Sequence, residues 1–394
     1  MNGHVIKNAK VISENGILEG VDIYLRNGII TDPYPGACEY DAQGMYLAPG
    51  FIDLHFHGIM NRRVEAPDNL NLKEITRILP KYGVTGFLPT VGPTMSKEED
   101  VKLLREISRV VPDGANILGF LLEGHFLSLT GAFKSLPEEK DNEKKVRMLI
   151  DAVKPYEAIF CISPEFPGID KLLDIMTQNS LPAFVTHTRA DHKQAQRAID
   201  RGATHATHFW NVFPYTGDIE GGVRGNGSVE AFYANPHTTV DFILDGEHVE
   251  PVAVKMALAC KGIDKVSLIT DSNVNAGMPP GTYTGLDGSD IVVAYEGGPA
   301  RLAPGTHFPG GLAGSGLTMD RALANAVKML GVSLADAVRM VSTNPASVLK
   351  LSHKKGYIKT GYDADMVLLS KELTVEACFV GGEIKYDRKM EERS

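Results

Sequence analysis

The sequence predicts an α/β protein in which a (β/α)8 barrel carries a small β-sandwich domain formed by both chain ends. Three observations lead to this fold class. Eight short apolar, β-rich runs alternate with helical patterns over about 220 residues, as a parallel barrel requires. Both chain ends instead show short strands separated by turn residues. The length of 394 residues, at roughly 150 residues per domain, accommodates a barrel with an appended domain.

The two chain ends share a pattern of short alternating runs and hairpin turns. Near the N-terminus, the run Val21–Leu25 lies between the turn pairs Asn15-Gly16 and Asn27-Gly28. The same pattern returns near the C-terminus, in Ala364–Leu369, Ala377–Val380, the Gly381-Gly382 turn and Ile384–Tyr386. We therefore predict that residues 1–49 and 346–394 together form the sandwich domain and that residues 50–345 form the barrel.

The central region contains eight apolar runs typical of buried strands. They are Phe51–His57, Gly86–Val91, Ile117–Glu123, Ile159–Glu165, Ala183–His187, Ala206–Asn211, Thr239–Leu244 and Val266–Asp271. Helical spacing of apolar residues fills the gaps, for example in Leu72–Tyr82, Lys97–Val111, Glu143–Val153, His192–Arg201 and Pro251–Lys261. Two further helices, Thr318–Met329 and Leu334–Val341, are predicted to follow. A doubly wound open sheet shows the same alternation and is the alternative fold.

Composition excludes several classes of function. The 49 acidic residues outnumber the 40 basic ones, and no Lys/Arg-rich run is present, so we expect no nucleic-acid partner. No apolar run approaches the ~20 residues of a membrane span, so we expect no membrane partner. The four cysteines are scattered without metal-site spacing, which fits a reducing compartment. We expect a soluble, cytoplasmic protein.

Ionisable residues lie at the ends of the predicted strands. His55 and His57 end the first run, and the other positions are Glu123 in the third, His187 in the fifth, His208 in the sixth and Asp271 in the eighth. The C-terminal ends of barrel strands meet at one mouth, where catalytic groups lie. These six residues are therefore expected to meet in space.

The residue types and their spacing indicate a metal site. His55 and His57 are two apart, so both imidazoles project from one face of a strand. A single strand-end histidine is usually a packed residue, but chance poorly explains four histidines and two carboxylates at matching positions. Imidazole and carboxylate ligands suit Zn(II) or Fe(II) and suit Mg(II) poorly. A hydrolytic metal site is the natural interpretation.

Three residues near these positions need separate interpretation. Asp271 is predicted to bind metal and to move a proton between water and a leaving amine, with a helix N-cap as the alternative. His248, just past the seventh run, is either a substrate contact or a solvated loop residue. His205 faces away from His208 on a regular strand and is not expected to be a ligand.

These residues also match a known family. The segment Pro49–Gly58 resembles the first strand of the amidohydrolase superfamily, whose barrels carry a small β-sandwich built from both chain ends. More narrowly, the chain resembles the N-acetylglucosamine-6-phosphate deacetylases in Leu122–Gly124, Thr207–Asn211, Asp245–Val249, Ile269–Asp271 and Leu312–Ser315. The resemblance covers nearly the whole chain in the right order.

The resemblance implies a role for each candidate residue. Glu123, His187 and His208 would bind the main metal, while His55 and His57 would help to hold a second metal bridged by Glu123. The ions would be one or two divalent transition metals (Zn, Fe or Mn). Asp271 would transfer the proton. Asn211 and His248 would lie near the sugar or its phosphate.

Three positions depart from the family pattern. His125 replaces a proline after Glu123-Gly124, and we predict a catalytic role for it in polarising the carbonyl. Phe133 stands where a carbonyl-polarising histidine is usual. Asp218 and Glu220 stand near the usual phosphate-binding arginine, which leaves Arg224 as the nearest one. We therefore assign Arg224 and Phe133 to the substrate site.

The predicted function is a metal-dependent deacetylase that hydrolyses the N-acetyl amide of an amino sugar, N-acetylglucosamine 6-phosphate or a close relative. A deacylase or amidase for another small amide is the first alternative. A non-catalytic scaffold with the same fold is the second. The expected partners are the small N-acylated sugar, possibly phosphorylated, and a second copy of the chain in a homodimer.

Overall fold

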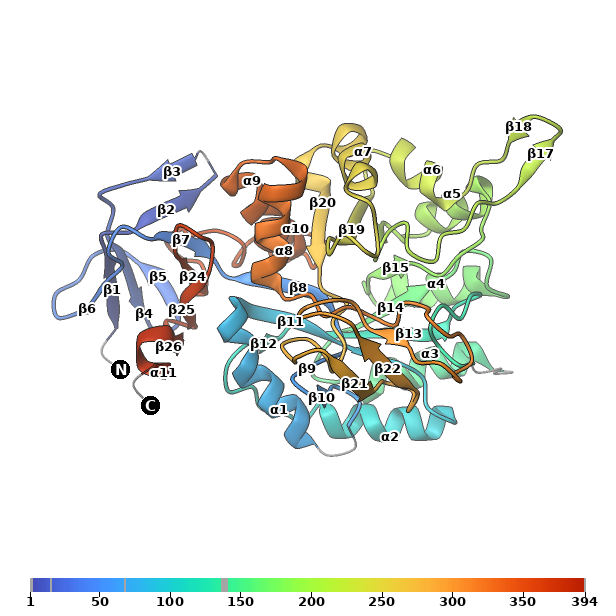
Figure 1. Cartoon of the computed structure of the whole chain (residues 1–394), viewed down its shortest axis with the longest axis horizontal. Coiled ribbons are helices and arrows are strands. Elements are labelled where there is room, and N and C mark those ends of the chain that lie inside the picture. Colours follow the sequence, from blue (N-terminus) through green and yellow to red (C-terminus); the bar gives the residue numbers. More distant parts are fainter. Residues whose placement is uncertain (1–2, 15, 67–68, 136–140, 393–394) are drawn as a thin grey trace.

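The computed structural model describes the chain except for residues 1–2, 15, 67–68, 136–140 and 393–394. Asn15 of the predicted Asn15-Gly16 turn thus lies outside the described residues. The chain forms a barrel with a smaller group of sheets beside it, at which both termini lie (Figure 1).

Eight parallel strands form the barrel, so the predicted (β/α)8 fold is confirmed. The register runs from β8 through each strand to β20 without a reversal of direction. The barrel closes beyond β20, where Asp271 N–H donates to the carbonyl of His55 at 2.9 Å and Phe56 bridges Ser272. The strands are β8 (Phe51–Phe56), β11 (Val84–Val91), β13 (Phe120–Phe126), β14 (Ala158–Ile162), β15 (Ala183–Val185), β16 (His205–Ala206), β19 (Thr239–Ile243) and β20 (Val266–Ile269).

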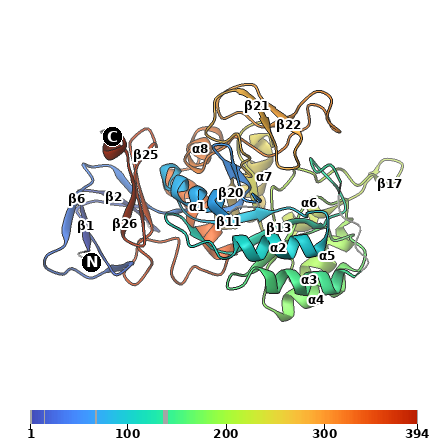
Figure 2. The same cartoon turned by 90° about the horizontal axis from the view of Figure 1, so that it is seen from below.

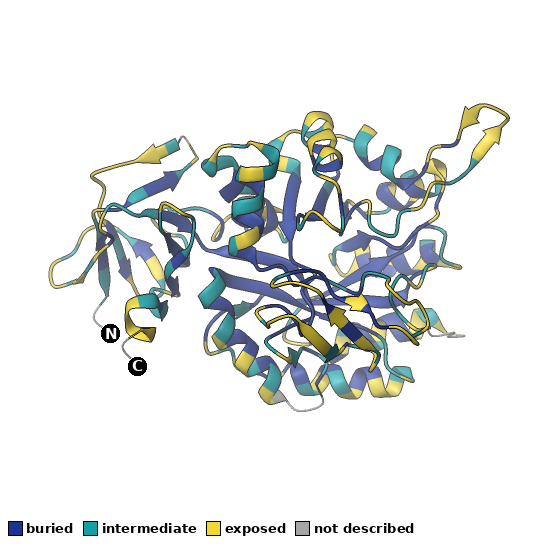
Figure 3. Ribbon diagram, in the orientation of Figure 1, coloured by how far each residue is buried: buried dark blue, intermediate teal, exposed yellow. Residues whose placement is uncertain are grey.

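Helices cover the outside of the barrel, so its strands are buried on both faces, which explains their uninterrupted apolar composition (Figure 3). The helices are α1 (Asn69–Ile78), α2 (Lys97–Ile107), α3 (Asn142–Ala152), α4 (Ile169–Gln178), α5 (His192–Asp200), α6 (Ser228–Ala234), α7 (Pro251–Lys261), α8 (Met319–Asn325), α9 (Leu334–Val338) and α10 (Asn344–Val348).

Two predicted helix ends are wrong for a reason visible in the sequence. Helix α2 ends at Ile107 and not at Val111, and Pro112 disfavours helical backbone at the residue before it, Val111. Helix α1 gives way to a tighter 3-10 turn at Leu79–Tyr82, which contains Pro80.

Both chain ends build the smaller group of sheets. One sheet has the order β5 (Ile29–Thr31), β4 (Ile23–Arg26), β1 (His4–Lys7), β6 (Cys38–Asp41). The other has the order β26 (Glu383–Asp387), β25 (Val375–Val380), β24 (Met366–Leu369), β7 (Tyr46–Pro49), β2 (Lys10–Ser13), β3 (Gly16–Leu18). A cluster of buried side chains with members from both sheets, including Leu25 and Phe379, packs apart from the barrel core. We propose that these sheets form a domain of residues 1–49 and 346–394.

Further strands lie beside the barrel (Figure 2). An antiparallel sheet of β21 (Gly281–Thr284), β22 (Asp290–Val293) and β23 (Arg301–Leu302) follows the last barrel strand. Two short hairpins pair β9 (Gly58–Ile59) with β10 (Arg62–Arg63) and β17 (Asp218–Glu220) with β18 (Val223–Arg224). A short helix, α11 (Arg388–Glu391), follows β26. Among the described residues, no helix combines the length and the apolar character of a membrane span.

Candidate active site

A cavity of about 380 Å³ opens at the C-terminal ends of the barrel strands. Five of the six predicted metal ligands line it: His57, Glu123, His187, His208 and Asp271. The sixth, His55, is fully buried against them. The structure therefore brings together all six residues that sequence position singled out.

The histidines of β8 face two carboxylates. The Nε2 atoms of His55 and His57 lie 3.2 Å apart. Each is 3.3 Å from Glu123 Oε2, and their distances to Asp271 Oδ1 are 3.6 and 3.4 Å. Four potential ligand atoms thus converge on one point.

The second oxygen of Glu123 faces the other two histidines. Glu123 Oε1 is 3.1 Å from His208 Nε2 and 3.5 Å from His187 Nε2. Glu123 therefore stands between two groups of ligands and presents one oxygen to each, which is the position of a bridging carboxylate.

Three of these predicted ligands have left-handed backbone conformations. The φ angles are 47° at His187, 34° at His208 and 46° at Asp271. Such conformations are strained for residues other than glycine and persist where neighbouring groups fix them. Ser163 Oγ donates to the carbonyl of His187 at 2.8 Å, and Asp241 Oδ1 accepts the N–H of His208 at 2.6 Å.

Hydrogen bonds at Nδ1 fix the orientation of three imidazoles. His187 Nδ1 lies 2.9 Å from the carbonyl of Leu129, and His208 Nδ1 lies 3.1 Å from the carbonyl of Asn211. A carbonyl only accepts, so both Nδ1 atoms carry a proton, and both Nε2 atoms face Glu123. His55 Nδ1 contacts Thr207 Oγ1 at 3.1 Å.

The clustered groups shift one another's pKa values. Burial alone would lower the pKa of His57, but Asp271 and Glu123 outweigh it and raise the pKa to about 10. At His208 burial is likewise outweighed, mainly by Glu123, and the pKa rises to about 9. Burial prevails at His187 and lowers its pKa to about 4. The imidazoles outweigh burial at Glu123 and Asp271 and hold both carboxyl pKa values below the ordinary range.

This geometry fits a divalent metal ion. In the groups His55–His57–Asp271 and His55–Glu123–His208, all ligand atoms lie within 4.8 Å of one another. Imidazole nitrogens and carboxylate oxygens together suit transition metals such as Zn and Fe. Burying so many ionisable groups is costly unless they bind something, which argues against a non-catalytic scaffold.

The predicted substrate contacts at Asn211, His248 and Phe133 also line the cavity. The His248 side chain is largely buried, and its Nδ1 pairs with Asp245 Oδ2 at 2.7 Å. The ring of Phe133 lies 6.1 Å from that of His187. These positions are compatible with substrate contact.

His125 is not in the cavity, so its position gives no support to the predicted catalytic role. Its ring is buried outside the barrel mouth, with Nδ1 3.5 Å from Asp100 Oδ2. Burial and Lys145 lower its pKa to about 3 against the opposing effect of Asp100. Two-residue spacing would put His125 on the face of Glu123 in a regular strand. Gly124 has φ 98°, however, and the register shifts between Leu122 and Phe126, so the strand turns.

Arg224 is also outside the cavity. It lies in the β17–β18 hairpin, where it pairs with Glu230 at 2.8 Å and stacks 5.5 Å from the ring of Tyr215. The hairpin extends away from the barrel mouth (Figure 1). Its predicted substrate contact is therefore not made within this chain.

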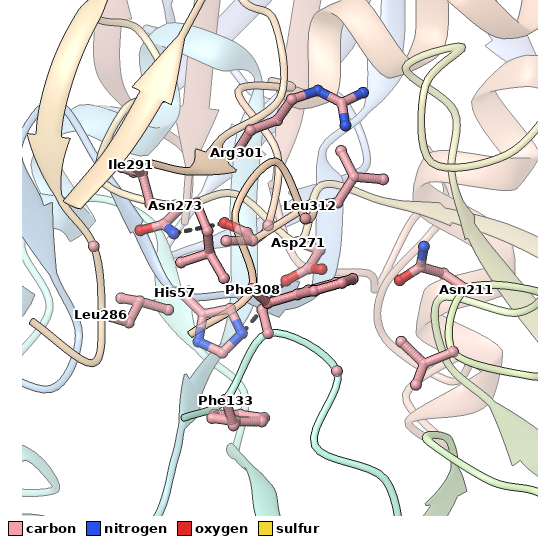
Figure 4. Close-up of a pocket in the computed structure, with 18 of the residues that line it drawn as sticks. His57, Phe133, Asn211, Asp271, Asn273, Leu286, Ile291, Arg301, Phe308 and Leu312 are labelled. Atoms are coloured by element: carbon pink, nitrogen blue, oxygen red, sulfur yellow. Dashed lines mark hydrogen bonds and ion pairs between the residues drawn. The ribbon is translucent and has the colours of Figure 1, made fainter. Parts of the chain in front are cut away.

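Several residues that line the cavity are not predicted from the sequence. Leu286, Ile291, Arg301 and Phe308 come from the β21–β23 sheet and its loops, and all four line the cavity (Figure 4). The alternation in Asp290–Val293 indicates a strand. It does not indicate that the strand packs beside the barrel mouth.

Comparisons with known proteins identify the family of the chain. A profile of the amidohydrolase family matches residues 225–385. An N-acetylglucosamine-6-phosphate deacetylase of Lysinibacillus sphaericus is 30% identical over 97% of both chains. An N-acetylgalactosamine-6-phosphate deacetylase of Escherichia coli O157:H7 is 29% identical, covering 97% of this chain and 99% of its own.

Solved structures show the same similarity. The N-acetylglucosamine-6-phosphate deacetylase of Pasteurella multocida superimposes with a TM-score of 0.86 at 25% identity, over 98% of this chain and 100% of its own. That of Mycobacterium smegmatis, solved with N-acetyl-D-glucosamine-6-phosphate, gives 0.84 at 26% identity with the same coverage. The chain therefore belongs to the amidohydrolase superfamily, in the family of the N-acetylglucosamine-6-phosphate deacetylases.

Proposed function

We propose that this protein is a metal-dependent hydrolase that removes the acetyl group from the nitrogen of an amino-sugar phosphate. The observation that carries the proposal is the position of Glu123 between two groups of imidazoles at the floor of a cavity. Relatives that match along nearly the whole chain act on N-acetylglucosamine 6-phosphate or N-acetylgalactosamine 6-phosphate by name. We propose one of these two sugars as the substrate.

The ligand groups would hold two divalent ions, Zn(II), Fe(II) or Mn(II). His55, His57 and Asp271 would hold one, His187 and His208 the other, and Glu123 would bridge them. Ions held there supply a Lewis acid for the amide carbonyl and lower the pKa of a water molecule towards ~7.

Asp271 would move the proton. Its carboxylate lines the cavity, and its low pKa keeps it ionised and able to accept a proton from water. Returning that proton to the departing nitrogen makes the leaving group a neutral amine. In the overall reaction, one water molecule hydrolyses the amide to acetate and the free amino sugar.

The remaining cavity walls would orient the sugar. Asn211 and His248 offer polar groups, whereas Phe133 and Leu286 offer apolar surface. Phe133 has no group to polarise a carbonyl, so that task would fall to the ions. Acetyl is the proposed acyl group because the relatives are deacetylases by name, and a different small amide is the alternative.

A metal and substrate assay tests the proposal. Purified protein is expected to contain one to two equivalents of transition metal and to release acetate from both sugar phosphates, or from one of them. Chelation should abolish activity, and Zn(II), Mn(II) or Fe(II) should restore it. Full activity in metal-free protein would exclude the metal mechanism. Absence of acetate release from every N-acetyl sugar would exclude the substrate class.

We further propose a homodimer in the cytoplasm. The β17–β18 hairpin exposes Ile219 (69%) and Val223 (43%), apolar side chains that a second copy could cover. The described structure contains four free cysteines, which fits a reducing compartment. Light scattering of the purified chain, with Ile219→Lys as the variant, tests the dimer.

A further inference from the structure

We infer that Arg301 binds the anionic group of the substrate and gives the site its preference for a phosphorylated sugar. The inference rests on the proposed function and assigns a specificity-determining residue to it. It also replaces Arg224, whose side chain lies outside the cavity.

Arg301 has the right position. It begins β23 and lines the cavity. Figure 4 shows Arg301 and Asn211 on one side of the pocket, and Phe133 and Leu286 on the other. Among the cavity-lining residues that the structure describes, Arg301 is the one Lys or Arg side chain. Arg301 thus supplies the cavity with a cationic group on the side of Asn211.

Neighbouring groups hold the guanidinium in place. Arg301 Nη2 donates to Glu247 Oε2 at 3.0 Å, and Nη1 donates to the carbonyl of Gly310 at 3.1 Å. Tyr295 Oη donates to Glu247 Oε1 at 2.8 Å, so the carboxylate is itself anchored. Glu247 directly precedes His248, which also lines the cavity, so the anchor of the arginine lies next to another cavity residue in the sequence.

The guanidinium of Arg301 favours an anionic ligand. A guanidinium has five N–H donors, and the two contacts above leave others for a ligand. The arginine side chain is 44% exposed, so a ligand in the cavity can reach it. Phosphate oxygens match the planar fork of arginine and form charge-assisted hydrogen bonds with it. Glu247 partly neutralises the arginine, so the carboxylate should limit how tightly the anion binds.

Substitution at Arg301 tests the inference. We compare kcat/KM for N-acetylglucosamine 6-phosphate and for N-acetylglucosamine in the metal-loaded wild-type protein, Arg301→Met and Arg301→Lys. Losing a charge-assisted contact should lower kcat/KM for the phosphorylated sugar by roughly 10- to 100-fold, mainly through KM. The unphosphorylated sugar should change by less than about threefold. Arg301→Lys should fall between wild type and Arg301→Met.

Further variants separate specificity from structural damage. Arg105→Met, at an exposed position of α2, is the matched control and should leave kcat/KM for both substrates unchanged. Glu247→Gln keeps an acceptor for the guanidinium but removes the competing charge, and it should lower KM for the phosphorylated sugar. An equal loss for both sugars in Arg301→Met, with unchanged thermal unfolding, would overturn the inference. So would a loss for the phosphorylated sugar in Arg224→Met that Arg301→Met does not show.

A binding measurement separates this inference from the proposed function. Calorimetry compares glucosamine 6-phosphate with glucosamine and needs no turnover. Tighter binding of the phosphate by wild type than by Arg301→Met supports the role of Arg301 even if no acetyl sugar is hydrolysed. Equal binding of the two compounds by wild type would overturn it even if hydrolysis is observed.

Discussion

Asp271 differs from Glu123 in how it contacts the other ligands. Glu123 contacts imidazoles of both ligand groups through its two oxygens. Asp271 contacts His55 and His57 through Oδ1. Loss of Glu123 should therefore disrupt both groups, whereas a neutral replacement of Asp271 should leave most of the site intact.

The substitution Asp271→Asn separates proton transfer from metal binding. The amide preserves the shape of the carboxylate but not its basicity, so kcat should fall at least ~100-fold, the usual magnitude for a general acid–base group. Metal analysis and steady-state kinetics measure the two effects. Activity within a few-fold of wild type would assign proton transfer to another cavity residue.

Asp241 should control metal affinity without touching the substrate. Its Oδ1 holds the strained backbone of His208, and its Oδ2 contacts His205 Nε2 at 2.8 Å. Asp241→Asn places an N–H₂ group in this network, so metal affinity should fall by roughly 10- to 100-fold, as for other outer partners of metal ligands. Competition with a chelator measures the affinity. Asp200→Asn, at an exposed position of α5, is the matched control and should bind metal like wild type.

Strand-end position predicted the six clustered residues because barrel topology alone brings such ends together. Spacing failed for His125 because the backbone of Gly124 leaves the regular strand geometry, and a two-residue interval no longer means a shared face. Spacing was informative for His205, because this residue follows regular strand geometry. The sequence predicts that it is not a ligand, and its ring contacts Asp241 and Thr239.

Helix α5 offers a test of stability that is independent of the site. Asp191 and Gln194 form a reciprocal capping box at its first turn, with distances of 2.8 and 3.0 Å. Asp191→Ala should lower the free energy of unfolding by about 1 kcal/mol and leave kcat nearly unchanged. Urea denaturation measures the loss. Asp200→Ala removes the same charge at the other end of α5 and should cause no destabilisation, because acidic residues near a helix C-terminus oppose its dipole.

The position of the β21–β23 sheet cannot be predicted from the sequence. Alternation identifies strands, but only tertiary packing decides which surface they cover. Here Ile291 and Leu302 pack with Val274 and Ala313 in a small cluster separate from the barrel core. That packing places the sheet beside the mouth, and no local feature of the sequence specifies it.

The metal-free protein should lose stability as the solution becomes alkaline. His57 and His208 have folded pKa values of about 10 and about 9, above the unfolded value of about 6.5. Their contribution is therefore complete below about pH 6.5 and is lost as pH rises through 9 to 10. Urea denaturation of metal-free protein at pH 6 and pH 10 should show this decrease.

Metal binding should release the same protons. Histidine binds metal only as the neutral imidazole, so loading at pH 7.5 should release about two protons, one each from His57 and His208. Calorimetry in buffers of different ionisation enthalpy counts them. Uptake of metal without proton release would contradict the assigned ligand atoms.

The cavity draws its floor and one of its walls from separate parts of the chain. The floor comes from barrel strands whose side chains also complete the core, whereas the wall of Ile291, Arg301 and Phe308 comes from the added sheet and its loop. Side chains in the wall can therefore change without altering the barrel core or the six clustered residues. Such a division lets descendants of one hydrolase diverge toward new substrates by varying a peripheral segment while the reactive centre is inherited unchanged.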